Sequence, residues 1–180
     1  MVTNHVMLNT ERLEIGPWTP DDVSAGLAIF GSDEVTRWLA PAMEPIHDDA
    51  GMLATLERWA KEDAEAEPPV GHWAVRRAED EELVGSITLR RMPPFHEDLE
   101  LAWQFSPRHW GNGYATEAAR AVAAWAFEGS ADELFAVMRP ANERAEKVAR
   151  RLGMEWVGET DKYYDLRLQV YRLRRTDLSR

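Results

Sequence analysis

Residues 99–119, LELAWQFSPRHWGNGYATEAA, contain a strand pattern, a glycine-rich turn and the start of a helix. In the first third, large apolar side chains alternate with Glu100, Ala102 and Gln104, which is the period of a strand that buries one face. Pro107 ends the ladder of this strand because proline has no N–H to donate. Alanine-rich sequence follows the last glycine and favours a helix. The segment therefore predicts a strand joined to a helix by a tight loop.

The loop has the composition of an anion-binding turn. Gly111 and Gly113 allow positive φ and a close approach of the backbone to a ligand, and the helix behind them begins with N–H groups that lack intrahelical acceptors. Such donors suit a phosphate, and Arg108 would add positive charge. A Walker loop is excluded because Tyr114 replaces its lysine, and a dinucleotide GxGxxG because Thr116 replaces its third glycine. A turn without any ligand is the alternative.

Outward from this segment, the hydrophobic period predicts further strands and helices. Strands are expected at residues 12–18, 72–77, 83–91, 99–105, 133–139, 154–160 and 166–173. Helices are expected at about residues 20–30, from residue 33, at 48–66, from the glycine loop to about 127, and at 142–152, with a break at APAMEP, residues 40–45. This order predicts one domain over residues 1–180, an α/β mixed sheet covered by helices on both faces.

Composition narrows the function classes. The 180 residues carry a formal net charge of −11, which disfavours nucleic acid and favours cationic partners such as amines, solubility alone being the other interpretation. The chain has no cysteine, so it has no thiolate chemistry, and its five histidines show no metal-ligand spacing. No signal peptide or membrane-spanning run is apparent, so a cytoplasmic protein without a membrane partner is expected.

Four segments, taken in order, resemble the GNAT superfamily of acyl-CoA-dependent N-acyltransferases. They are LNTERLEIGPWTPDD, LVGSITLRR, ELAWQFSPRHWGNGYATEAA and NERAEKVARRLGMEWVGE, and they include the family signature at Arg108, Gly111 and Gly113. The match covers nearly the whole chain and is most similar to the branch of ribosomal-protein N-terminal acetyltransferases. It implies a splayed mixed sheet of about six to seven strands, flanked by helices on both faces, with acyl-CoA in the gap.

The resemblance also implies a donor site. It places the CoA pyrophosphate on the loop and the first helical turn, with Gln104 and Phe105 pairing with the pantetheine arm like an added strand. It puts Asn142 beside the pantetheine, although a helix N-cap is an equal interpretation of this residue. Acetyl-CoA is the implied co-substrate, and no metal is implied. The implied pyrophosphate residues are Trp110, Gly111, Asn112, Gly113, Tyr114, Ala115 and Thr116, with Arg108 as a source of charge.

Acetyl transfer requires a neutral amine. Deprotonation at pH 7 costs about 1.4 kcal/mol for an α-amine and about 4.6 kcal/mol for a lysine, so a base matters more for lysine. Glu100 is the candidate base, at a position where the family often has a glutamate, and a solvated surface carboxylate is the alternative. A backbone N–H near Phe105 is the candidate donor to the tetrahedral oxyanion.

The general acids of many relatives are absent. Ala145 and Ala149 stand where relatives carry a serine or a tyrosine. A thiol pKa near 8.5 allows the thiolate to leave without an acid, and Tyr163 or Tyr164 is the alternative acid. In addition, Trp38 and Trp103 are candidates for lining the acceptor pocket, although aromatic side chains usually pack in the core. The candidate acids and the candidate pocket residues are both inferred from residue type and position alone.

The sequence therefore predicts an N-acetyltransferase that moves acetyl from acetyl-CoA to a primary amine, such as a protein N-terminal α-amine, by direct attack in a ternary complex. Three alternatives remain: a catalytically weak CoA-binding regulatory protein, an acyltransferase for an antibiotic or polyamine, and a succinyltransferase. The acceptor, the acyl group and the choice between monomer and homodimer stay open.

Overall fold

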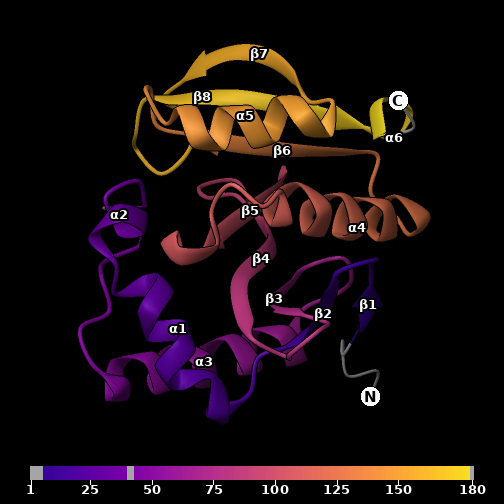
Figure 1. Cartoon of the computed structure of the whole chain (residues 1–180). Coiled ribbons are helices and arrows are strands. Elements are labelled where there is room, and N and C mark those ends of the chain that lie inside the picture. The colour runs from indigo at the N-terminus through magenta and orange to yellow at the C-terminus, as the bar shows by residue number, and fades with distance from the viewer. Residues whose placement is uncertain (1–5, 40–42, 179–180) are drawn as a thin grey trace.

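The computed structural model describes residues 6–39 and 43–178 and contains an open eight-stranded sheet in the order β1-β2-β3-β4-β5-β6-β8-β7 (Figure 1). Every neighbouring pair is antiparallel except β5 and β6. The strands are β1 (Leu8–Asn9), β2 (Leu13–Pro17), β3 (Gly71–Arg77), β4 (Leu83–Arg91), β5 (Leu99–Phe105), β6 (Glu133–Met138), β7 (Glu155–Thr160) and β8 (Leu168–Arg174). The expected splayed mixed sheet is confirmed.

Helices cover both faces of the sheet, as predicted. They are α1 (Val23–Phe30), α2 (Asp33–Thr36), α3 (Asp49–Glu65), α4 (Tyr114–Glu128), α5 (Glu143–Leu152) and α6 (Arg175–Leu178), with 3-10 turns η1 (Pro20–Asp22) and η2 (Pro107–His109). The expected count of six to seven strands is wrong by one because β1 has only two residues, too few to show a period. The break predicted at residues 40–45 lies partly outside the described residues. Within the described residues, no helix is long and apolar enough to cross a membrane.

The central strands have one apolar and one polar face. Trp73, Ile87 and Leu101 join the main core under α4, where Ala118 and Val122 are fully buried. The alternate residues of the same strands face the layer that contains α1 and α3. This arrangement follows from the two-residue period of a strand, and it leaves polar side chains on the sheet beneath α1 and α3.

The sheet opens between β5 and β6. Only Glu100 and Phe135 are paired across this parallel junction. The Ser106 N–H donates to the Val84 carbonyl at 3.0 Å, so the even-numbered residues of β5 direct their backbone groups to β4. The odd-numbered residues, including Trp103 and Phe105, therefore direct theirs toward the gap. The gap exposes an unpaired strand edge inside the molecule.

The loop between β7 and β8 connects the two halves of the sheet. Lys162 Nζ and the Tyr163 hydroxyl donate to Asp98 at 2.9 and 2.5 Å, and the Tyr164 hydroxyl donates to Glu100 at 2.5 Å. We call these five residues the clasp. Burial, and then the negative charge of Glu100, raises the pKa of Tyr164 well above its usual value, so its hydroxyl stays protonated as a donor. The clasp therefore adds side-chain hydrogen bonds across the junction that has a single strand bridge.

Candidate active site

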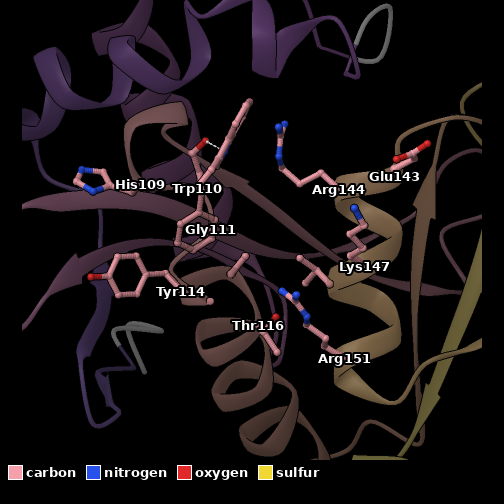
Figure 2. Close-up of a pocket in the computed structure, with 13 residues that line it drawn as sticks. His109, Trp110, Gly111, Tyr114, Thr116, Glu143, Arg144, Lys147 and Arg151 are labelled. Atoms are coloured by element: carbon pink, nitrogen blue, oxygen red, sulfur yellow. Dashed lines mark hydrogen bonds between the residues drawn. The ribbon is translucent and has the colours of Figure 1, made fainter.

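A cavity of about 350 Å³ lies between the glycine loop and α5 (Figure 2). Phe105, at the end of β5, forms one end of its wall, and the first turn of α4 forms another. Side chains of α5 stand opposite. The cavity is lined by Phe105, His109, Trp110, Gly111, Gly113, Tyr114, Ala115, Thr116, Glu143, Arg144, Lys147, Val148 and Arg151.

The loop presents its backbone donors to this cavity. Gly111 and Gly113 have φ of +83° and +79°, a conformation that favours glycine. No described residue accepts a backbone hydrogen bond from the N–H groups of residues 111–116, whereas the Trp110 N–H donates to the Pro107 carbonyl at 3.3 Å. The first helical bond runs from Glu117 to Gly113. Unpaired donors at the positive end of a 15-residue helix form a site for an anion.

Side-chain contacts hold the loop in this shape. Arg12 Nη1 donates to the Asn112 carbonyl at 3.0 Å, and Asn112 Nδ2 donates to the His109 carbonyl at 3.0 Å. Glu117 receives hydrogen bonds from Thr10 and from Arg12. Partial burial alone would raise the pKa of Glu117, but these hydrogen bonds outweigh it and lower the pKa. The loop carbonyls are thereby occupied, and the amide donors stay available.

Three cations of α5 supply the positive charge of the cavity, and the sequence interpretation missed them. Arg144, Lys147 and Arg151 are exposed and extend from α5 toward the loop (Figure 2). Their spacing of three and four residues along one helix face was a readable signal. Arg108, the cation expected from the sequence, is exposed and is not among the residues that line the cavity. The charge therefore comes from the wall opposite the loop.

Thr116 provides a test of whether a phosphate fits this cavity. Its hydroxyl Oγ1 is buried and has no hydrogen-bond partner, and the residue lines the cavity. Buried polar atoms are nearly always paired, so this orphan calls for an explanation. A threonine in a helix has two accessible χ1 rotamers, and a phosphate oxygen in the cradle would give the rotated hydroxyl an acceptor. The free amides, the orphan hydroxyl and the three cations fit the pyrophosphate of CoA.

A second cavity of about 100 Å³ continues from the first along the open edge of β5. Trp38 and Trp103, singled out in the sequence, both line it, as does Gln104. Phe105 lines both cavities, and its carbonyl accepts from Trp110 Nε1 at 2.9 Å. The second cavity is lined by Glu34, Val35, Trp38, Leu39, Trp103, Gln104, Phe105, Trp110, Ala115, Asn142, Arg144, Ala145 and Val148.

Asn142 is the N-cap of α5, and it also lines a cavity. Its side chain accepts from the Ala145 N–H at 3.3 Å and so caps α5, and the residue also lines the second cavity. Arg144, in the first turn of the same helix, stacks on the Trp110 ring with its guanidinium carbon 3.2 Å from the ring centroid. This stack joins the glycine loop to α5 where the two cavities meet. Asn112, by contrast, is exposed and contributes to the loop only through its backbone and its contacts with it.

The structure places Glu100 away from both cavities. The residue is 4% exposed, and its carboxylate accepts from Arg90 Nε at 2.7 Å and from the Tyr164 hydroxyl. Arg90 also lies over the Tyr164 ring, 5.4 Å from its centroid. The Tyr164 contact joins residues 64 apart in the chain, and no local pattern indicates it. No group of three or more metal-ligating side chains occurs in the part of the chain that the structure describes.

Comparison with known proteins identifies the family of the chain. Residues 12–155 match the acetyltransferase (GNAT) domain family. Over 168 residues, covering 87% of each chain, the protein is 28% identical to the uncharacterized N-acetyltransferase YoaA of Bacillus subtilis. An acetyltransferase from Agrobacterium tumefaciens is 26% identical with a TM-score of 0.74, over 94% of this chain and 95% of that one.

A ribosomal-protein acetyltransferase homologue shares the fold as well. RimJ of Mycobacterium smegmatis, solved in complex with CoA-disulfide, superimposes with a TM-score of 0.79 at 16% identity, over 98% of this chain and 89% of that one. The family resemblance predicted from the sequence is thus confirmed by the domain match and by the fold. Members of the family use acetyl-CoA as co-substrate and act on amines. The chain belongs to the GNAT acetyltransferase family and is an N-acetyltransferase.

Proposed function

We propose that residues 1–180 act as one domain that transfers acetyl from acetyl-CoA to a primary amine, such as a protein N-terminal α-amine, by direct attack in a ternary complex. The cradle of unpaired amides at residues 111–116, opposite Lys147 and Arg151, carries this proposal. The pyrophosphate binds these amides, and the α5 cations bind the remaining phosphate charge. The pantetheine amides then pair with the odd-numbered residues of β5 in the second cavity.

The neutral amine attacks the thioester carbonyl from the α2 side of the second cavity. The Phe105 N–H faces the gap and donates to the tetrahedral oxyanion. Glu34, an exposed carboxylate that lines this cavity, takes the proton of the amine directly or through water. Glu100, the base expected from the sequence, is the second candidate, and it would act through Tyr164 from its buried pair. An α-amine depends little on a general base, because its deprotonation at pH 7 costs about 1.4 kcal/mol.

The collapse of the intermediate expels the CoA thiolate. Ala145 lines the second cavity and Ala149 is buried, so neither of these positions supplies an acid. The hydroxyls of Tyr163 and Tyr164 are committed to carboxylates in the clasp. The thiolate therefore leaves unprotonated and takes its proton from solvent, as a thiol pKa near 8.5 permits.

A regulatory protein that binds CoA without turnover is the second candidate function, favoured by the two alanines at the acid positions. Release of free thiol from acetyl-CoA and, in parallel, from succinyl-CoA, across a panel of amines, separates the two. We expect turnover with acetyl-CoA and with at least one amine class. Calorimetric CoA binding without thiol release for every amine would favour the regulatory protein. Glu34→Gln and Glu100→Gln are then compared, and the true base is the one whose loss removes the acidic limb of the kcat/KM profile.

A further inference from the structure

A third cavity, of about 100 Å³, opens on the face of the sheet beneath α1 and α3. Thr88 of β4 and Gln104 of β5 lie on its sheet side, and the rings of Phe30 and Trp59 form its helical wall. Gln104 also lines the second cavity, and so does Leu39. The third cavity therefore continues from the point where the amine meets the thioester.

Two arginines line this small cavity in a chain whose net charge is −11. Arg90 rises from β4, and its only carboxylate partner among the described residues is Glu100, reached through Nε at 2.7 Å. A guanidinium carries five N–H donors, so the two Nη groups of Arg90, on a side chain 38% exposed, retain donors for a ligand. Within the part of the chain that the structure describes, Arg58 of α3 has one loose carboxylate partner, Glu62, at 3.9 Å. Both arginines can therefore bind an additional anion.

Three carboxylates lie near the two arginines: Glu100 pairs with Arg90 Nε at 2.7 Å, Glu62 lies 3.9 Å from Arg58, and Asp63 pairs with His72. His72 lines the cavity, but its Nδ1 is paired with Asp63 at 2.8 Å and its ring stacks on Trp59 with centroids 5.0 Å apart. Glu62 lies between His72 and Arg58 at 3.8 and 3.9 Å, beyond a good hydrogen bond to either. The floor adds only the neutral Thr88 and Gln104. A planar carboxylate matches this arrangement because guanidinium groups bind carboxylates through parallel N–H donors.

We propose that the amine acceptor carries a carboxylate, held by Arg58 and Arg90 while its amine lies in the second cavity near Glu34. This inference rests on the proposed function and names its substrate class: an amino acid, or a peptide with an acidic group near its N-terminus. Polyamines and aminoglycosides would bring positive charge against the two arginines. Glu34 in the second cavity, which Arg144 also lines, takes the amine end, and the two arginines of the third cavity hold the carboxylate, so such an acceptor binds in one orientation.

Thiol release from acetyl-CoA tests this with three matched series of acceptors. The first is ω-amino acids from glycine to 6-aminohexanoate, the second is the alkylamines of equal length, and the third is the corresponding diamines. Short peptides with an acidic or a neutral second residue form a further arm, which separates peptide from amino acid. We expect kcat/KM to favour the carboxylate series over the alkylamines by roughly 10-fold or more, because hydrogen bonds to charged groups are strong. The best chain length reports the spacing between the two cavities.

Arg58→Gln is the main variant for testing carboxylate binding, since Arg58 is largely exposed and its loss leaves the fold intact. It should raise the KM for carboxylate acceptors, leave the KM for acetyl-CoA unchanged and reduce the preference for carboxylates. Arg90→Lys should do the same while keeping a cation beside Glu100. Arg91→Gln is the matched control, because this neighbour of Arg90 is exposed and does not line the cavity.

The outcomes distinguish the two proposals. Equal or better turnover of alkylamines or diamines, or an Arg58→Gln preference equal to that of the unmodified protein, overturns the carboxylate inference and leaves the acetyltransferase proposal standing. Absence of thiol release with every amine overturns the proposed function and the inference together. A preference confined to peptides assigns the carboxylate to an acidic side chain or a peptide C-terminus, and a preference for free ω-amino acids assigns it to a small molecule.

Discussion

Adding one methyl group at Gly85 tests the position assigned to Phe105. The two residues are cross-strand partners, and a Cβ at Gly85 would lie 2.4, 2.5 and 2.6 Å from three atoms of the Phe105 ring. Ordinary van der Waals contact begins near 3.4 Å, so the ring must recede by about 1 Å. Phe105 is 6% exposed, and it lines the first and second cavities, so the ring can yield only toward them or together with its own backbone. Gly85→Ala must therefore displace the residue that lines both the first and second cavities.

The change in the free energy of unfolding caused by Gly85→Ala follows from these contacts. Overpacking a well-filled core costs about 1–3 kcal/mol. Replacing glycine by alanine returns about 0.4–1 kcal/mol, because the unfolded chain loses freedom. We expect a net destabilisation of about 1–2 kcal/mol, and a fall in Tm of about 2–8 °C. Because the Phe105 N–H faces the gap, a shift of about 1 Å should lower kcat/KM by roughly 100-fold.

Urea unfolding and thiol-release kinetics measure the two effects. Gly129→Ala is the control, since its Cβ would meet no atom closer than 3.5 Å; it should gain at most about 0.4–1 kcal/mol of stability from the unfolded chain and leave the rate unchanged. A double variant, Gly85→Ala with Phe105→Leu, replaces the ring by a smaller side chain that the new Cβ can contact without a clash, and it should cost less than the sum of the single changes. Unchanged stability and rate in Gly85→Ala, or strict additivity in the double variant, would refute the role given to this contact.

Four further substitutions test the donor site and the clasp. Lys147→Gln and Arg151→Gln should each weaken CoA binding about 5-fold at low salt and less at high salt, because both cations are exposed, whereas Arg150→Gln should leave the calorimetric Kd unchanged. The pKa of Glu117 is lowered by folding, so its contribution is present above about pH 4.5 and is lost as pH falls through the folded value. Glu117→Gln should therefore destabilise by about 0.5–1 kcal/mol at neutral pH, with a smaller difference in denaturation measured below pH 4.5. Tyr164→Phe should lower the free energy of unfolding by about 1–2 kcal/mol and raise the Kd for CoA, and an unchanged Kd would show that the clasp does not set the width of the gap.

Sequence patterns predicted most of the fold because its elements are strongly periodic. The strand at residues 99–105 and the strand at 83–91 have the bounds that alternation indicated. Thr19 and Asp22 form a capping box at the start of η1, and Gly153 ends α5 with φ of +89°. Both features depend on neighbouring residues alone. What was missed, β1 and α6, consists of two and four residues, too short for a period to appear.

The site was predictable only where one segment builds it. The glycine loop carries its own signal, since positive φ and a following helix are local properties. The α5 cations could be assigned to the site only once it was known that this helix faces the loop across the gap. The surroundings of Glu100 depend on Tyr164, 64 residues away, and those of Arg58 depend on how α3 packs over β4. Tertiary placement decides such contacts, and no local pattern encodes it.

The open edge of β5 has a genetic consequence. Its donors and acceptors are main-chain groups whose direction is fixed by the register with β4, so they are present whatever side chains stand at Trp103 and Phe105. Ordinary missense changes there alter shape and packing but cannot delete these groups. Only a proline, which removes the N–H, or a shift of register can do so. The main-chain donors and acceptors of the β5 edge are therefore retained as long as the sheet topology is retained, even when the codons for Trp103 and Phe105 change.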